Sequence, residues 1–374
     1  MRILICAGGT GGHVYPALAA VDRLQKARAA LGGVQLLWVG SIGGMERKMV
    51  SEVGISMESI WAGGVVGQGL RNGLLGMIKL AAGTVQALRI ILRFRPDVIF
   101  LTGGYIAVPV SLSGWFWRVP LAVYLPDVQP GLAVRWSASL AERVMVTMPQ
   151  SQKYFPNKRV TVTGYPLRQD IVRARRATRQ ESREVFNLSL ERPTVLVVGG
   201  SRGARSINRA ALSHGPDWIE GGAQVLHVSG RLDWHTVEER RGKFSPETRK
   251  YYQIFPYLTD RMGLALRAAD LAVARAGASC LGEFPIFGLP ALLVPYPHAW
   301  RYQRENAEVL SECGAAKWID DRDLNIKLGR TVGDLLENHG LLAEMSRQAT
   351  ELAVPKAAER VATELIDMVA KSVT

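Results

Sequence analysis

Short runs of apolar residues alternate along this chain with longer stretches that have the periodicity of amphipathic helices. The runs are nearly continuous in apolar residues, which is typical of strands that are buried on both faces of a sheet. With helices between them, such strands predict an α/β fold built on parallel, doubly wound sheets. The predicted strands are residues 2–7, 34–39, 97–101, 120–124, 143–147, 194–198, 223–228, 270–274 and 290–294.

The order of strand, glycine-rich turn and helix occurs at the start of the chain and again near its middle. Strand 2–7 runs into a glycine-rich turn at 8–12, and strand 194–198 runs into a second one at 199–203. A segment with helical periodicity follows each turn. This internal repeat predicts two Rossmann-like halves in tandem.

The predicted boundary between these halves lies near 164–168, because residues 169–192 are highly charged and contain no strand-like run. It gives an N-terminal domain at 1–166 and a C-terminal domain at 167–355. Two domains are expected for 374 residues at ~100–200 residues per domain. We expect the two domains to face a cleft, because α/β proteins bind ligands outside the carboxyl ends of their strands.

The glycine-rich turns at 8–12, 102–105 and 199–203 predict phosphate binding. Glycine lets the backbone approach an anion, and the N-terminus of the following helix offers N–H groups and partial positive charge. The same glycines could serve packing alone, and that alternative stays open. The dinucleotide fingerprint is absent because Val14 stands where it requires glycine, and no P-loop motif occurs.

The formal net charge of +13 predicts anionic partners such as phosphorylated ligands or an anionic membrane. We do not expect nucleic acid, because zinc-ligand spacing, an RNA-binding aromatic motif and a basic tail are missing. The cysteines Cys6, Cys280 and Cys313 lie far apart, which argues against a disulfide framework or a structural zinc. Without a secretory signal or ~20 consecutive apolar residues, we expect a cytosolic protein or one attached to a membrane without crossing it.

Several short sequence motifs contain these turns or follow them along the chain. They are GGTGGHVYPALA (8–19), TGGY (102–105), GYPLR (164–168), GGSRGARSIN (199–208), RAGASCLGE (275–283), GLPALLVPYPH (288–298), and Gln303 with Asn306. In this order they resemble the MurG family over nearly the whole chain. The resemblance implies a GT-B fold and inverting transfer of N-acetylglucosamine from UDP-GlcNAc to a lipid-linked MurNAc-pentapeptide, lipid I, in peptidoglycan synthesis. It also implies a C-terminal helix, 356–374, that returns to the first domain, and a location on the cytoplasmic face of the cell membrane.

The resemblance assigns residues to both substrates. UDP-GlcNAc is assigned to Thr10, Gly11, Gly12, Arg168, Ser201, Leu258, Ala278, Ser279, Cys280, Leu281, Gly282, Glu283, Gln303 and Asn306, and the acceptor side to Gly103, Gly104 and Tyr105. A guanidinium such as that of Arg168 suits a leaving diphosphate, whose negative charge grows in the transition state. The carboxylate of Glu283 suits a ribose diol, although a solvated residue near a helix N-terminus is the alternative. The spacing around Leu258 is off by one residue from the family pattern.

His13 is the candidate general base, because an imidazole near neutral pKa can take the proton of an attacking hydroxyl. The alternative is a structural role in which His13 donates to a backbone carbonyl. The family usually carries His-Glu-Gln-Asn after the strand that ends here at Tyr124, but this chain has the shorter 125–131, LPDVQPG. Asp127 then either substitutes as a base or caps the following helix. Arg202 stands where the family usually has glutamine.

Residues 61–96 contain Arg71, Lys79, Arg89, Arg93 and Arg95 without any acid, interleaved with apolar residues. This pattern fits docking on an anionic bilayer. It also fits an ordinary amphipathic helix that faces the core and has a basic rim. Both interpretations stay open from the sequence.

Three other functions remain possible. They are a GT-B transferase with another lipid or small-molecule acceptor, a UDP-GlcNAc 2-epimerase, and a UDP-sugar-binding protein without activity. We expect that the reaction requires no cofactor. We also expect no fixed metal site, because the acidic run Asp320–Asp323 is more typical of a polar loop. A divalent cation such as Mg²⁺ could still assist through the diphosphate of the donor.

Overall fold

The structure is a computed structural model that describes residues 1–27, 32–63, 69–200, 203–297 and 302–373, with side chains described except at 69–75 and 372–373. The chain divides into two compact units. Unit 1 contains Met1–Arg168 and Lys356–Thr374, and unit 2 contains Gln169–Pro355. The division falls two residues after the boundary expected from the sequence.

Unit 1 is built on a parallel seven-stranded sheet with the order β3-β2-β1-β4-β5-β6-β7. Its strands are β1 (Arg2–Ala7), β2 (Gln35–Ser41), β3 (Ser56–Ile60), β4 (Val98–Gly103), β5 (Leu121–Leu125), β6 (Arg143–Val146) and β7 (Val160–Val162). Every residue of β4, β5 and β6 is buried, as expected for strands that are covered on both faces.

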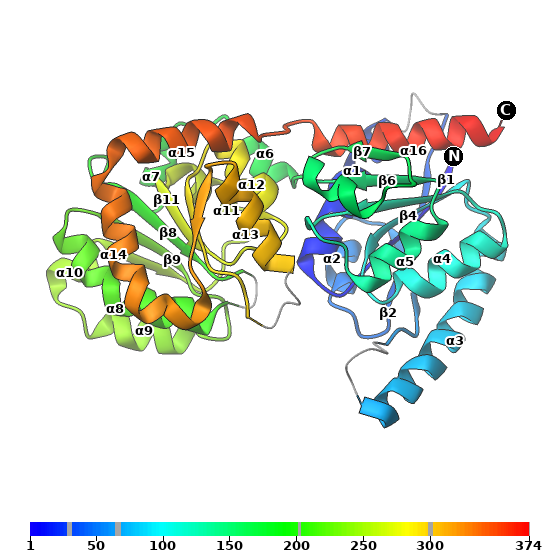
Figure 1. Ribbon diagram of the computed structural model, residues 1–374, viewed down its shortest axis with the longest axis horizontal. Helices are drawn as coiled ribbons and strands as arrows, with labels where there is room; N and C mark the ends of the chain where they lie inside the picture. Colours follow the sequence, from blue (N-terminus) through cyan, green and yellow to red (C-terminus); the bar gives the residue numbers. More distant parts are fainter. Residues whose placement is uncertain (28–31, 64–68, 201–202, 298–301, 374) are drawn as a thin grey trace. The chain divides into compact units, whose positions relative to one another are not determined.

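The helices of unit 1 cover both faces of this sheet (Figure 1). They are α1 (Gly11–Lys26), α2 (Glu46–Glu52), α3 (Gly69–Phe94), α4 (Ala107–Phe116), α5 (Leu132–Leu140), the 3-10 helix η1 (Pro149–Tyr154) and α16 (Ala357–Val373). Although α16 is the last helix of the chain, it packs against α1 and buries Val361 and Leu365 in the same core as Ile3. The buried guanidinium of Arg143 forms an ion pair with Glu364 on α16.

Unit 2 repeats the topology with a parallel six-stranded sheet, in the order β10-β9-β8-β11-β12-β13. The strands are β8 (Thr194–Val198), β9 (Gln224–Val228), β10 (Tyr252–Phe255), β11 (Leu271–Ala274), β12 (Ala291–Leu293) and β13 (Ala316–Trp318). The helices are α6 (Gln169–Ala174), α7 (Arg179–Glu184), α8 (Arg205–Glu220), α9 (Trp234–Gly242), α10 (Pro246–Lys250), α11 (Met262–Ala268), α12 (Cys280–Phe287), α13 (Tyr302–Glu312), η2 (Asp321–Asp323), α14 (Leu324–Glu337) and α15 (His339–Glu351).

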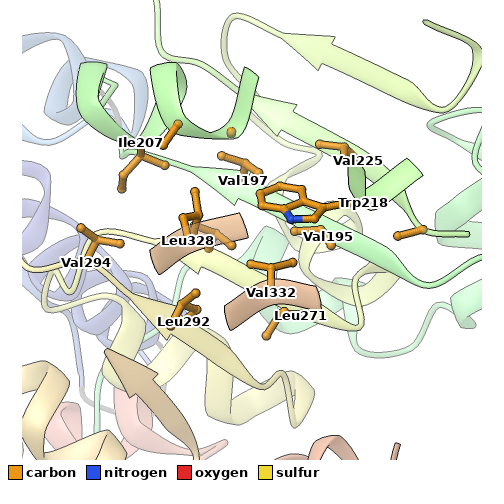
Figure 2. Packing of buried hydrophobic residues seen from close by; sticks show 14 of the residues in the cluster. Val195, Val197, Ile207, Trp218, Val225, Leu271, Leu292, Val294, Leu328 and Val332 are labelled. Carbon is orange, nitrogen blue, oxygen red and sulfur yellow. The ribbon is translucent and has the colours of Figure 1, made fainter. Parts of the chain in front are cut away.

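One core cluster of unit 2 forms where α8 and α14 pack against the sheet. Figure 2 shows Ile207 and Trp218 of α8 gathered with Leu328 and Val332 of α14 around the side chains of β8. The indole N–H of Trp218 donates to the carbonyl oxygen of Gly329 at 3.2 Å, so its polar atom is satisfied within the core. This packing anchors α8, whose N-terminus follows the second glycine-rich turn.

All nine predicted strands are present within two residues of the predicted bounds. The structure adds four strands that the apolar pattern did not predict, namely β3, β7, β10 and β13. Each of the four lies at an edge of its sheet.

Candidate functional site

The strand order reverses between β1 and β4 in unit 1 and between β8 and β11 in unit 2. Loops that leave neighbouring strands in opposite directions at such a switch point open a crevice at the carboxyl edge of the sheet. In unit 1 these loops are the turns at 8–12 and 103–105, and in unit 2 they are the turns at 199–203 and 275–279. The predicted glycine turns therefore lie where this fold binds ligands.

The turn after β1 leads into a helix that has no side-chain cap. Gly9 has a φ of +91°, which favours glycine, and the side chain of the N-cap residue Thr10 does not cap a backbone N–H of the helix. The first turn of α1 contains no acidic residue that would satisfy its partial positive charge. Such a helix end is suited to an anion.

The same turn and the Thr102–Gly103 turn enclose His13. The hydroxyl of Thr102 donates to the His13 carbonyl oxygen at 2.7 Å, and the Thr10 hydroxyl lies 3.1 Å from Nδ1 of the ring. A Cβ added at Gly103 would lie 2.6 Å from Cδ2 and 2.9 Å from Nε2 of His13. Gly103 also has a φ of +126°, so only glycine fits beside this imidazole. The two blocks GGTGGH and TGGY thus form one constellation.

Burial lowers the pKa of His13 below its ordinary value, and the negative charge of Asp127 opposes that shift. The imidazole is therefore neutral near pH 7, as a general base must be. The hydroxyl of Thr10 lies beside Nδ1 of the ring, which leaves Nε2 as the nitrogen for a proton acceptor. Helix α5 has Gly131 as its N-cap, so the alternative in which Asp127 caps this helix is wrong.

Buried hydrogen bonds hold the first residues of the short loop that follows β5. The Thr147 hydroxyl lies 3.2 Å from the carbonyl oxygen of Leu125 and 2.8 Å from that of Pro126. The phenol of Tyr124 lies 2.6 Å from the Thr147 hydroxyl and 3.2 Å from the carbonyl oxygen of Gly164. These buried contacts fix the start of the loop that brings Asp127 into the electrostatic environment of His13.

Two further residues of unit 1 complete this edge. A Cβ added at Gly104 would lie 2.6 Å from the Gly8 carbonyl oxygen, so the two turns touch through their backbones. The side chain of Tyr105 is exposed, as a residue on the acceptor side would be.

The sequence reasoning missed Glu46, which is fully buried and accepts hydrogen bonds from the Ser41 N–H and hydroxyl, both at 2.6 Å. Its carboxylate braces the turn after β2.

In unit 2, the turn at 199–203 packs tightly at one of its glycines and openly at another. Gly203 has a φ of +80°, and a Cβ there would lie 2.4 Å from the Ser229 carbonyl oxygen. Gly200 also has a positive φ, of +87°, but a Cβ there would meet nothing within 4 Å. The N-cap of α8 is Ala204, which has no capping side chain, and its first turn has no acid. The predicted Ser201, like Arg202, lies outside the described residues.

A buried network of hydrogen bonds includes Ser229, whose carbonyl oxygen lies beside Gly203. Asn208 donates through Nδ2 to the Ser229 carbonyl oxygen at 2.9 Å and to Asp233 at 3.0 Å. Its Oδ1 lies 3.0 Å from Nε2 of His227, and Nδ1 of His227 lies 3.0 Å from the Tyr252 hydroxyl. Because Asn208 Oδ1 can only accept, His227 carries its proton on Nε2 and accepts from Tyr252. Burial lowers the pKa of His227 to about 3, so this imidazole stays neutral.

Arg275 ties together the loops at the carboxyl edge of the unit 2 sheet. Its guanidinium donates to the carbonyl oxygens of Val294 at 3.2 Å and Pro295 at 3.3 Å. It also forms an ion pair with Asp321 at 2.5 Å and donates to the Ser206 hydroxyl at 2.8 Å. The sequence reasoning assigned no role to Arg275. A charged residue directly after the buried strand β11 was the available signal.

The residues predicted to bind the sugar donor differ in how accessible their side chains are. Glu283 is half-buried in the first turn of α12, and Ser279 is the N-cap of this helix without a side-chain cap bond. The side chain of Gln303 is half-buried and accepts a hydrogen bond from the Tyr296 N–H at 2.9 Å. Residues with buried side chains, which can offer only their backbone to a ligand, are Leu258, Ala278, Cys280 and Leu281.

Asn306 is the one predicted contact that the structure reassigns. Its side chain is fully buried and donates to the Ala276 carbonyl oxygen at 3.0 Å. Asn306 therefore positions the loop after β11. Among the described residues, no group of three or more His, Cys, Asp or Glu side chains could hold a metal ion.

Comparison with known families agrees with this arrangement. Residues 3–146 match the glycosyltransferase family 28 N-terminal domain, and residues 194–361 match the glycosyltransferase family 28 C-terminal domain. The chain belongs to glycosyltransferase family 28. The matched ranges contain both uncapped glycine turns, whereas the GYPLR block at 164–168 lies between the two ranges.

Relatives of this family 28 chain are similar over nearly their whole length. The UDP-N-acetylglucosamine--N-acetylmuramyl-(pentapeptide) pyrophosphoryl-undecaprenol N-acetylglucosamine transferase of Roseiflexus sp. (strain RS-1) is 39% identical, over 97% of this chain and 94% of the relative. The crystal structure of Acinetobacter baumannii MurG is 26% identical, with a TM-score of 0.76 and 99% of both chains covered. UDP-GlcNAc 2-epimerase from Neisseria meningitidis has a TM-score of 0.67 at 12% identity, covering 98% of this chain and 100% of the epimerase, which shows a shared fold alone.

Proposed function

We propose that this chain transfers N-acetylglucosamine from UDP-GlcNAc to N-acetylmuramyl-(pentapeptide) pyrophosphoryl-undecaprenol, which completes the lipid-linked disaccharide unit of peptidoglycan. The observation that carries the proposal is the match of 39% identity to a relative of that printed activity, over 97% of this chain. The site agrees with it, because unit 1 has a neutral histidine in an uncapped glycine turn and unit 2 has a second such turn.

In the proposed reaction, the acceptor hydroxyl attacks the anomeric carbon of the sugar while the bond from that carbon to the diphosphate breaks. UDP leaves with the bonding electron pair, and the configuration inverts. His13 accepts the hydroxyl proton on Nε2, while its Nδ1–H donates to the Thr10 hydroxyl 3.1 Å away. Asp127 stabilises the resulting imidazolium through its negative charge.

Stabilisation of the departing UDP falls to groups that donate hydrogen bonds or carry positive charge. We assign the diphosphate to the backbone of the turn at 8–12 and to Arg168. The family resemblance also assigns Ser201, which lies outside the described residues, to the donor. Glu283 accepts from the ribose hydroxyls, and Gln303 contacts the sugar. The reaction requires no cofactor, and Mg²⁺ stimulates it only by neutralising diphosphate charge.

The experiment that tests the function is a transfer assay with radiolabelled UDP-GlcNAc and purified lipid I. Formation of the labelled lipid-linked disaccharide supports the proposal. If the chain binds UDP-GlcNAc but modifies only other lipid or small-molecule acceptors, the short 125–131 loop defines a different specificity. Epimer formation identifies an epimerase, and binding without turnover identifies an inactive binding protein.

We also propose that unit 1 docks on the cytoplasmic face of an anionic membrane, where a lipid-linked acceptor is held. Helices α3 and α4 lie side by side, and the Ser113 hydroxyl donates to the Thr84 carbonyl oxygen at 3.0 Å (Figure 1). The large apolar side chains that they and the following residue expose are Met77, Ile78, Val85, Leu92, Leu112, Trp115, Phe116 and Trp117. No helix of the described chain is long and apolar enough to cross a membrane.

This exposure argues against a helix α3 that merely faces the core. Ile78 is 57% exposed and Phe116 is 67% exposed, which is unusual for side chains of this size. The exposed basic residues Lys79, Arg89 and Arg93 lie on the same helix. Apolar side chains among cations are the composition of surfaces that enter an anionic interface. The side chain of Arg71 lies outside the described residues.

Charge reversal tests the docking. The double variant Lys79→Glu/Arg89→Glu is expected to bind weakly to vesicles containing anionic phosphatidylglycerol, because each cation near such a surface contributes about 1 kcal/mol. The control is Arg330→Glu on α14 of unit 2, which changes the charge of an exposed arginine outside this surface. Co-sedimentation of the double variant at the level of the control would contradict the proposal.

A further inference from the structure

Arg168, the last residue of unit 1, stacks on an aromatic ring of α1. The guanidinium carbon lies 4.7 Å from the centroid of the Tyr15 ring, within the range of a cation–π interaction. Both side chains are half-buried, so the pair is partly shielded from water. Stacking occupies the face of a guanidinium, while its N–H donors lie in the plane and point outward from the edge.

The same ring contacts the glycine turn. A Cβ added at Gly11 would lie 3.1 Å from Cε2 and 3.3 Å from Cδ2 of Tyr15. Tyr15 is four residues after Gly11, and helical side chains point back toward the N-terminus of their helix. The ring therefore covers the first turn of α1, and it places the stacked guanidinium next to the uncapped end of this helix.

At this position the charge of the guanidinium adds to that of the helix end. The N-terminus of α1 carries partial positive charge, and its first turn contains no acidic residue to balance a nearby cation. A free arginine side chain would turn away from this end and would also retain its rotamer freedom. The stack on Tyr15 offsets both costs, so a diphosphate that binds the turn meets a guanidinium already in place.

We propose that Tyr15 is a positioning residue that holds Arg168 for the diphosphate of the nucleotide donor. The inference rests on the proposed function, in which Arg168 contacts this diphosphate. Tyr15 acts through Arg168 and through packing on Gly11, and it does not itself touch the reacting atoms. A diphosphate occurs in the donor and in the lipid acceptor, so the test must separate these two sources.

The test compares Tyr15→Leu, which removes the ring, with Tyr15→Phe, which keeps it. Calorimetry is expected to show about tenfold weaker binding of UDP by Tyr15→Leu, because a partly desolvated cation–π contact is lost. Uridine, which has no phosphate, is expected to bind both variants and the unchanged protein equally. Tyr15→Phe is expected to bind UDP within about twofold of the unchanged protein, since the ring face remains.

A second comparison shows whether Tyr15 acts through Arg168. In an Arg168→Ala background, Tyr15→Leu is expected to cause no further loss of UDP affinity, because the stacked partner is gone. Tyr15→Met, which keeps an unbranched apolar side chain, replaces Tyr15→Leu if the latter does not fold. Its expected loss of UDP affinity is the same.

Several outcomes would overturn the proposal. They are unchanged or tighter UDP binding by Tyr15→Leu, equal losses for UDP and uridine, and an equal loss in the Arg168→Ala background. A raised KM for lipid I with unchanged UDP affinity would move the contact to the acceptor and overturn the assignment to the donor. Failure of the unchanged protein to bind UDP would instead refute the proposed function, and this is seen before any variant is compared.

Discussion

The two glycine turns have the same topology but different supports. Each follows the first central strand of its sheet and precedes a helix without a side-chain cap or an acid in its first turn. The turn of unit 1 contacts His13, whose pKa is lowered by burial and raised by the negative charge of Asp127. Behind the turn of unit 2 stands the neutral chain of Tyr252, His227 and Asn208. A duplicated fold can thus keep the same strand, turn and helix in both copies while different residues pack around each turn.

The largest effect is expected from His13→Gln, because loss of a general base slows a reaction by roughly 10²–10⁴-fold. The affinity for UDP is expected to change little, since the imidazole does not contact the donor phosphates in our assignment. Steady-state kinetics with lipid I and calorimetry with UDP measure the two quantities. A variant that retains most of its kcat would show that His13 has a structural role.

Gly103→Ala tests how closely His13 is held. The new Cβ would lie 2.6 Å from Cδ2 of the imidazole, at a φ of +126°, and displacement of a catalytic group by about 1 Å can cost 10²-fold in rate. Gly222→Ala is the matched control, because Gly222 lies outside the turns assigned to the substrates and has a positive φ of +94°, but a Cβ there meets nothing within 4 Å. Equal kcat values for the two variants would mean that backbone strain, rather than contact with His13, sets the effect.

The buried, neutral His227 in unit 2 makes the stability of the protein depend on pH. His227 has an ordinary pKa of 6.5 when unfolded and about 3 when folded, so between these values the unfolded chain binds the extra proton. Stability present above pH 6.5 is therefore lost as the pH falls toward 3, by roughly 1.5 kcal/mol between pH 6.5 and 5. Urea unfolding at both pH values measures this loss for the unchanged protein and for His227→Gln. The same loss in both proteins would contradict the assignment to His227.

The smallest effect is expected from Asp127→Asn, and its sign is specific. The negative charge of Asp127 raises the pKa of His13 against the lowering by burial, so its removal lowers this pKa further. The acid limb of the kcat/KM profile is then expected to move to lower pH, with a smaller kcat because the base is weaker. If the acid limb of the kcat/KM profile does not move, the charge of Asp127 does not influence the titration of His13.

Much of the candidate site could be predicted from local sequence. The turns at 8–12, 102–105 and 199–203 are contiguous blocks, and glycine at a strand end has a clear backbone reason. The role of Asn306 could not be predicted, because only its burial against Ala276 shows that it positions a loop. Arg275 was missed for a similar reason, because its partner Asp321 lies in η2 and only the fold brings the two together. Glu46 pairs locally with Ser41, and only its burial shows that it supports the turn after β2.

The sequence by itself determined the central strands of both sheets, and the tertiary structure decided the outer ones. Central strands such as β4 are buried on both faces, so their composition is almost wholly apolar and visible without neighbours. The unpredicted strands β3, β7, β10 and β13 each pair on one side only and are partly exposed. Their residues mix polar and apolar types, and backbone pairing with an existing sheet is what makes them strands.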